Sequence, residues 1–112
     1  MSHESDQSKR IRELNDKLRT TFTGGDVLNT VGIDALSSDV QASILEKVRT
    51  FSEFSEENDP CGEHDYGSFQ IAGHHVMWKI DYYDERLEGH SEDAADPTKT
   101  RRVLTILLAS EY

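Results

Sequence analysis

Cysteine is almost absent from this sequence, since Cys61 is the single one among 112 residues. No disulfide can therefore form within the chain, and a zinc site built from several cysteines of one chain is excluded. The sequence also lacks any apolar stretch near the roughly 20 residues that span a bilayer. Residues 1–6 lack the apolar region of a signal peptide. We therefore expect a cytoplasmic protein without a membrane partner.

Motifs of common enzyme classes are missing as well. The sequence has no phosphate loop, nucleophile elbow or dinucleotide fingerprint, so we predict no cofactor, and a non-enzymatic role is favoured. A length of 112 residues is close to the commonest size of one domain. We predict one domain over residues 1–112, with residues 1–5 disordered.

The net charge of −10 is concentrated in the middle of the chain. Residues 53–96 hold thirteen acidic side chains and two basic ones, whereas the remainder is nearly balanced. Such a negative field disfavours direct binding of nucleic acid and favours a basic protein surface as the partner. The alternative interpretation is that acidic loops are solvated and keep the protein soluble.

An amphipathic helix is predicted over about residues 5–22. Its apolar residues recur at spacings of three and four: Ile11, Leu14, Leu18 and Phe22. Gly24 and Gly25 are predicted to close it, because glycine permits the left-handed turn that ends helices. The opposite face is basic and could pair with the acidic middle, within one molecule or between copies, so a homodimer is one alternative.

A second helix is predicted over residues 39–51. Ser38 is its predicted N-cap, and Gln41 is placed to complete a capping box. A short strand is predicted between the two helices, over residues 27–32.

The strongest structural signal is a hairpin. If Ala72 and Gly73 form a two-residue turn, Phe69 lies opposite Val76 and Gly67 lies opposite Trp78. One face of the sheet then carries the apolar set Phe69, Ile71, Val76, Trp78, Ile80 and Tyr82. A shift of one residue would scatter this set over both faces, so the pattern fixes the register.

A long acidic loop is predicted over residues 84–99. The apolar run that follows, residues 103–109, fits a central strand covered on both faces and also a short buried helix, and its length favours the strand. The predicted fold class is α+β, with two helices packed on a small, mostly antiparallel sheet of three to four strands.

Carboxylates gather at the predicted strand end and in the acidic loop. The predicted partner-binding set is Asp81, Asp84, Glu85, Glu88, Glu92 and Asp93. Spaced carboxylates can present phosphate-like charge to a basic surface, so the favoured function is a small non-enzymatic protein-binding module that mimics nucleic-acid charge. The regular spacing of a calcium loop is missing, which weakens a metal role for this set.

Glu63, His64 and Asp65 form the densest group of chemically versatile side chains. They could supply a general base or hold a cation, so the alternative function is a small metal-assisted or acid/base hydrolase, with His64 and Asp65 as candidate metal ligands. Cys61 and His64 have the spacing of a thiolate and imidazole pair, which is an unspecific signal. Turn residues that satisfy backbone groups are the simpler interpretation, and the sequence alone establishes no function.

Several short strings are specific in combination: residues 11–15 and 21–25, Asn58-Asp59-Pro60, Gly62-Glu63-His64-Asp65, residues 78–84 and residues 102–106. Through them nearly the whole chain resembles a bacterial, chiefly alphaproteobacterial, family known as domain of unknown function 3768. The resemblance implies a compact protein without an established activity, often carried on plasmids or other mobile elements. Family members tend to have an aromatic residue in place of Cys61, which implies that this thiol is not an essential ligand or nucleophile.

Overall fold

The structure is a computed structural model and describes residues 5–112. Its elements are α1 (Asp6–Thr21), β1 (Asp26–Asn29), α2 (Val31–Asp34), α3 (Ser38–Thr50), β2 (Tyr66–Ile71), β3 (His74–Tyr83), β4 (Arg101–Leu108) and the 3-10 turn η1 (Ala109–Glu111). Most of the stretch predicted to be disordered, residues 1–5, lies outside the described residues. Ser5 is described and is the N-cap of α1, since its side chain accepts a hydrogen bond from Ser8 N.

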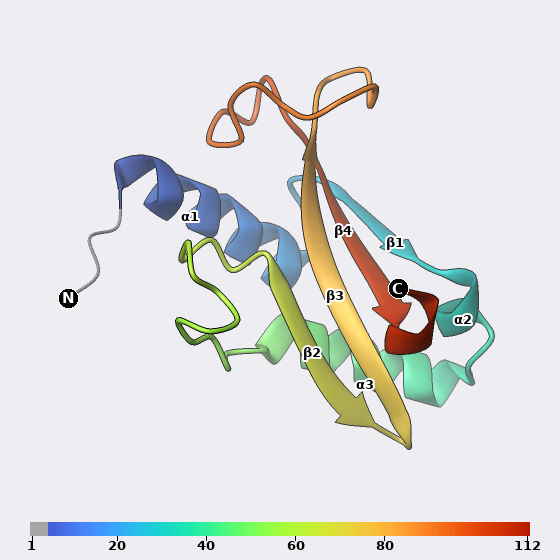
Figure 1. Ribbon diagram of the computed structural model, residues 1–112. Coiled ribbons are helices and arrows are strands. Elements are labelled where there is room, and N and C mark those ends of the chain that lie inside the picture. The colour runs from blue at the N-terminus through green and yellow to red at the C-terminus, as the bar shows by residue number, and fades with distance from the viewer. Residues whose placement is uncertain (1–4) are drawn as a thin grey trace.

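Four strands form one sheet in the order β1-β4-β3-β2. β3 is antiparallel to both β2 and β4, and β1 is parallel to β4. The two long helices, α1 and α3, lie on the same side of the sheet (Figure 1). The predicted α+β class with a mostly antiparallel sheet is therefore confirmed. Within the described residues no helix has the length and apolar character needed to cross a membrane.

The hairpin of β2 and β3 has the predicted register. Phe69 pairs with Val76 and Gly67 pairs with Trp78. Ala72 and Gly73 both have positive φ angles, 50° and 80°, as the two central residues of a primed turn require. The turn matches the strand twist even though alanine rarely adopts this conformation.

The core lies between the sheet and the two long helices. Its fully covered members are Leu18, Ile33, Ile44, Val48, Val76, Trp78, Ile80, Leu104 and Ile106. β4 contributes to both faces of the sheet, because Val103 and Leu107, which alternate with the core residues, are also buried. This confirms the predicted strand for residues 103–108 of the apolar run and explains why they lack polar alternation, whereas Ala109 lies in η1.

The region between the helices differs from the prediction. β1 ends at Asn29, and the predicted strand 27–32 is interrupted by the one-turn helix α2. The main-chain N–H of Gly32 donates to the Glu111 carboxylate at 2.9 Å, so a residue from the other end of the chain fixes this turn. The predicted strand is therefore too long at its C-terminal end.

The caps of the long helices also differ from the predictions. Ser37, not Ser38, caps α3, and its Oγ accepts from Val40 N at 3.3 Å. Gln41 does not complete a capping box, because its amide donates to the carbonyl oxygen of Leu36 at 2.8 Å. Helix α1 ends in a left-handed residue as predicted, but that residue is Phe22, whose N–H donates to Leu18 O at 2.8 Å.

Candidate functional site

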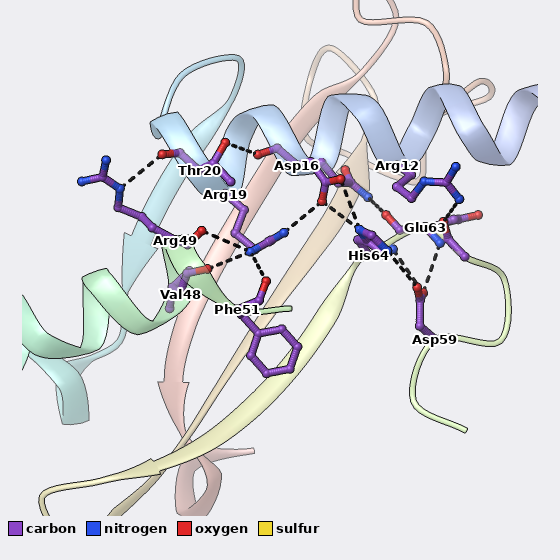
Figure 2. A network of polar contacts seen from close by, with 12 residues as sticks. Arg12, Asp16, Arg19, Thr20, Val48, Arg49, Phe51, Asp59, Glu63 and His64 are labelled. Carbon is purple, nitrogen blue, oxygen red and sulfur yellow. Dashed lines mark hydrogen bonds and ion pairs between the residues drawn. The ribbon is translucent and has the colours of Figure 1, made fainter. Parts of the chain in front are cut away.

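The segment of residues 52–65 connects α3 to β2 and is attached to α1 by a network of polar contacts (Figure 2). Asp59 organises the segment from within. Its Oδ1 accepts hydrogen bonds from the main-chain N–H groups of Glu63 and His64, both at 3.1 Å. Asp59 is 8% exposed, so these bonds are largely shielded from water. They bend the chain at His64, whose φ of 55° lies in the left-handed region.

The His64 imidazole lies between two carboxylates. Nδ1 is 2.9 Å from Asp16 Oδ1 on α1, and Nε2 is 3.6 Å from Asp59 Oδ2. The ring is stacked on Phe54, with centroids 3.8 Å apart and planes 4° from parallel. Because both ring nitrogens face carboxylates and one face of the ring is covered, this geometry favours a structural role for His64 over that of a general base.

A second chain of contacts joins α1 to β3 and β4. Asn15, which is fully buried, donates to the Tyr82 hydroxyl at 2.8 Å and accepts from Arg102 Nε at 2.7 Å. The Tyr82 hydroxyl in turn donates to Glu63 Oε1 at 2.8 Å. Burial raises the pKa of Tyr82 far above its usual range. The hydrogen bond from Asn15 lowers this pKa, whereas the hydrogen bond to Glu63 and its charge raise it further. The phenol therefore stays a neutral donor.

Arg19 fastens α1 to the end of α3. Its Nη1 donates to the carbonyl oxygens of Val48 at 3.0 Å and Phe51 at 2.8 Å, and its Nη2 bonds Asp16 at 3.0 Å. The guanidinium carbon lies 5.3 Å from the centroid of the Phe54 ring. Asp16 is thus held by Arg19 and His64 together, as Figure 2 shows.

A hollow of about 650 Å³ opens between the N-terminal end of α1 and the 52–65 segment. Its lining includes Arg12, Phe54, Asp59, Cys61 and His64. Arg12 also donates to Gly62 O at 3.2 Å, so its guanidinium helps to hold the segment. The lining mixes acidic and basic groups, and it therefore presents no single charge to a ligand.

Two smaller hollows lie at the acidic end of the sheet, where the loop of residues 84–100 extends beyond β3 and β4 (Figure 1). One, of about 280 Å³, is lined by Asp84, Glu85, His90, Glu92 and Lys99. The other, of about 340 Å³, is lined by Asp65, Ile80, Asp81, Tyr82, Tyr83, Gly89 and His90. Because His90 lines both, the two hollows adjoin and form one acidic end of the molecule.

The structure directs the three predicted catalytic residues to different neighbours. His64 lines the large hollow beside α1. Glu63 accepts from Tyr82, and Asp65 lines the hollow at the edge of β3. Neighbouring side chains of an extended segment point to opposite sides. The left-handed backbone at His64 turns the chain further, so the side chains on either side of it point in different directions. No group of three or more His, Cys, Asp or Glu side chains that could hold a metal ion occurs within residues 5–112.

Of the six predicted partner-binding residues, four line the two hollows at the acidic end: Asp81, Asp84, Glu85 and Glu92. Glu88 and Asp93 line neither hollow. Asp84 Oδ1 accepts from the N–H groups of Arg86 and Glu88, both at 3.0 Å, and Asp81 is paired with Lys79. Asp93 Oδ1 accepts from Ala95 N, and Glu92 lies 3.4 Å from Lys99 Nζ. Glu85 and Glu88 are exposed. Asp84 and Asp93 thus shape the loop and Glu92 is paired with Lys99, whereas Glu85 and Glu88 present the charge of the loop.

Sequence reasoning missed the buried polar residues that build this network, namely Asn15, Arg19 and Arg102. A signal for two of them was present. Asn15 follows Ile11 by four positions and Arg19 follows Asn15 by four, so both lie beside the apolar stripe of α1. A polar residue at a buried helical position is expected to have a specific partner.

A family model matches residues 29–111 of the chain. Its description is "Protein of unknown function (DUF3768)", and because the match covers most of the chain, the chain belongs to this family. Comparisons with curated proteins and with solved structures give no match.

Proposed function

We propose that this protein is a non-enzymatic binding module whose acidic end binds a basic protein surface, in competition with nucleic acid. The observation that carries the proposal is the convergence of Asp84, Glu85 and Glu92 on one hollow, where three carboxylates outnumber the single ammonium of Lys99. This hollow adjoins a second one lined by Asp65 and Asp81. Between Asp81 and Lys99 the chain has seven acidic residues and two basic ones. Clustered charge of one sign steers a partner of opposite sign to the surface that carries it.

The arrangement of the acidic loop supports the same proposal. Its carboxylates are held on a folded scaffold, because Asp84 and Asp93 bond main-chain N–H groups within their own turns. Thr100, at the end of the loop, is buried and its hydroxyl donates to Asp93 O at 2.8 Å. A loop that is ordered before binding loses less conformational entropy when the partner binds.

The test is the binding of labelled basic peptides, measured by fluorescence anisotropy. One peptide alternates arginine with glycine and a second alternates lysine with glycine. The wild-type protein is expected to bind both, with an affinity that falls steeply between about 50 and about 300 mM salt as charges are screened. Duplex DNA that binds the peptide is expected to compete with the protein.

Two variants with the same change of net charge identify the surface. E85K/E88K reverses two exposed glutamates of the acidic loop, and E46K/E53K reverses two exposed glutamates on and after α3. The first is expected to weaken peptide binding about tenfold and the second less than about threefold, because close charge pairs contribute more than distant ones. Equal losses in the two variants would show an effect of net charge alone and overturn the proposal.

A further inference from the structure

The edge of β3 is covered in two separate places, and a hollow lies between them. β2 covers the edge up to Lys79, which pairs with Tyr66, and the preceding residue, Asp65, extends this cover because its carbonyl oxygen accepts from Ile80 N at 2.9 Å. The returning loop covers it again at Tyr82, whose carbonyl oxygen accepts from Ser91 N at 3.0 Å. The hollow of about 340 Å³ is lined near this edge by Ile80, Tyr82 and Tyr83, together with Asp65. This is the lower end of the size range of about 300–1,000 Å³ for ligand pockets and suits one side chain.

Asp65 differs from Asp81, the other acidic residue of this hollow, because no cation within residues 5–112 compensates its charge. Asp81 is paired with Lys79, and Glu63 accepts from the Tyr82 hydroxyl. By contrast, the charged groups that act on Asp65 are all acidic: Glu63, Asp59 and Asp81. Burial and then the charge of Glu63 raise the pKa of the Asp65 carboxyl, so a cation placed beside it would relieve an unfavourable electrostatic environment.

We propose that this hollow is an anchor pocket that takes one arginine side chain of the basic partner, an inference that rests on the proposed function. A guanidinium is planar and weakly hydrated, stacks on aromatic rings and bonds a carboxylate through two N–H groups. Asp65 and the Tyr82 ring offer both kinds of contact, whereas the side chain of Tyr83, the next residue of β3, points to the opposite face of the sheet. Arg102 already occupies one face of the Tyr82 ring, with its guanidinium carbon 5.1 Å from the ring centroid, so the partner's arginine would stack on the opposite face. A lysine ammonium is more strongly hydrated and has no planar face to stack.

The experiment compares Asp65→Asn with Asp34→Asn, which makes the same chemical change at an exposed position on α2. D65N is expected to weaken binding of the arginine–glycine peptide about tenfold, because it removes a charge-assisted pair. Binding of the lysine–glycine peptide is expected to weaken less than about threefold, and D34N is expected to leave both affinities unchanged. Titration of the wild-type protein with N-acetyl-arginine amide is expected to shift the amide resonances of Ile80 and Gly89.

The outcomes separate this inference from the proposed function. If E85K/E88K weakens binding but D65N binds the arginine peptide as tightly as the wild type does, the anchor pocket is wrong and the acidic surface stands. Equal losses of the two peptides in D65N would also overturn the pocket, since they show a general charge effect. If the wild-type protein binds neither peptide at low salt, the proposed function and the anchor pocket fall together.

Discussion

The carboxylate of Glu111 occupies the space that a side chain on Gly32 would need. A Cβ added to Gly32 would lie 2.5 Å from Glu111 Cδ. The carboxylate accepts from Thr30 Oγ1 at 2.6 Å, from Gly32 N at 2.9 Å and from Leu108 N at 2.9 Å. These bonds fasten the C-terminal 3-10 turn to the start of α2.

The first prediction is that the effect of Gly32→Ala changes sign with residue 111. In the wild-type protein the new methyl group displaces the Glu111 carboxylate, so G32A is expected to lower the free energy of unfolding. In the E111A background the space is free, and G32A is expected to stabilise the protein by about 0.5 kcal/mol through the lower entropy of the unfolded chain. Urea denaturation of the four proteins of this cycle measures both effects. Equal effects in the two backgrounds would contradict the steric relationship.

The Glu111 bonds also predict a dependence on pH. The hydrogen bond from Thr30, followed by that from Leu108 N, lowers the pKa of the Glu111 carboxyl in the folded state. Its contribution to stability is therefore fully present above the ordinary glutamate pKa of 4.5 and is lost as the pH falls through the lower folded value. The difference in unfolding free energy between the wild type and E111Q is expected to be constant at neutral pH and to shrink below pH 4.5. A difference that grows on acidification would contradict this.

Gly67 is predicted to tolerate no side chain. Its partner in the strand register is Trp78, which is fully buried, and a Cβ at Gly67 would lie 2.5 Å from Trp78 Nε1. Because the indole is enclosed by the core, it cannot move aside as an exposed side chain could. G67A is expected to lower the free energy of unfolding by about 1–3 kcal/mol, as overpacking of a core does. Thermal melts of the two variants measure the loss. The control is S68A, at the next position on β2, which is expected to change the free energy of unfolding only slightly.

Asp59 is predicted to be the main support of the 52–65 segment. D59A would leave the N–H groups of Glu63 and His64 without their acceptor, at a cost of about 1–3 kcal/mol for a shielded unsatisfied group. D59N keeps an acceptor oxygen and is expected to lose less. Chemical denaturation measures the loss, with C61S at an exposed position of the same segment as the control. Equal stability of D59A and C61S would contradict the prediction that Asp59 supports the 52–65 segment.

Asp65→Asn is predicted to stabilise the protein at neutral pH. Burial and the charge of Glu63 raise the pKa of Asp65 in the folded state, so the folded protein binds this proton more tightly than the unfolded chain does. Ionisation of Asp65 therefore costs stability as the pH rises above the ordinary value of 3.8. The urea midpoint of D65N is expected to exceed that of the wild type at pH 7, and the difference is expected to vanish at about pH 3, below the ordinary value. A lower midpoint at pH 7 would contradict the raised pKa.

Sequence patterns predicted those parts of the fold in which the turn residues and the hydrophobic pattern demand the same arrangement. The β2–β3 register follows from residues 67–78 alone, because the turn and the alternation demand the same pairing. The helix α2 could not be predicted in this way, since its four residues depend on Glu111, 79 positions away from Gly32. The predicted cap of α3 is displaced by one residue because two adjacent serines offer the same chemistry.

The candidate site was predicted in composition but not in geometry. Three of the predicted acidic residues, Asp84, Glu85 and Glu92, line one hollow at an end of the sheet. Glu63, His64 and Asp65 were grouped by their adjacency in the sequence, whereas the left-handed backbone at His64 and the bonds from Asp59 direct them to different neighbours. Such a conformation is rare for a residue other than glycine and leaves no mark in a hydrophobic pattern.

The central position of β4 sets the order in which this molecule can be completed during synthesis. β4 is the neighbour of both β1 and β3, and its pairing with β1 joins Asp26 to Val103. Until residues 101–108 have left the ribosome, β1 lacks the strand with which it pairs, and the apolar faces of α1 and α3 have only the part of the sheet formed by β2 and β3 to pack on. Sheet closure therefore waits for β4, and the unpaired β1 is exposed to aggregation until that strand joins it.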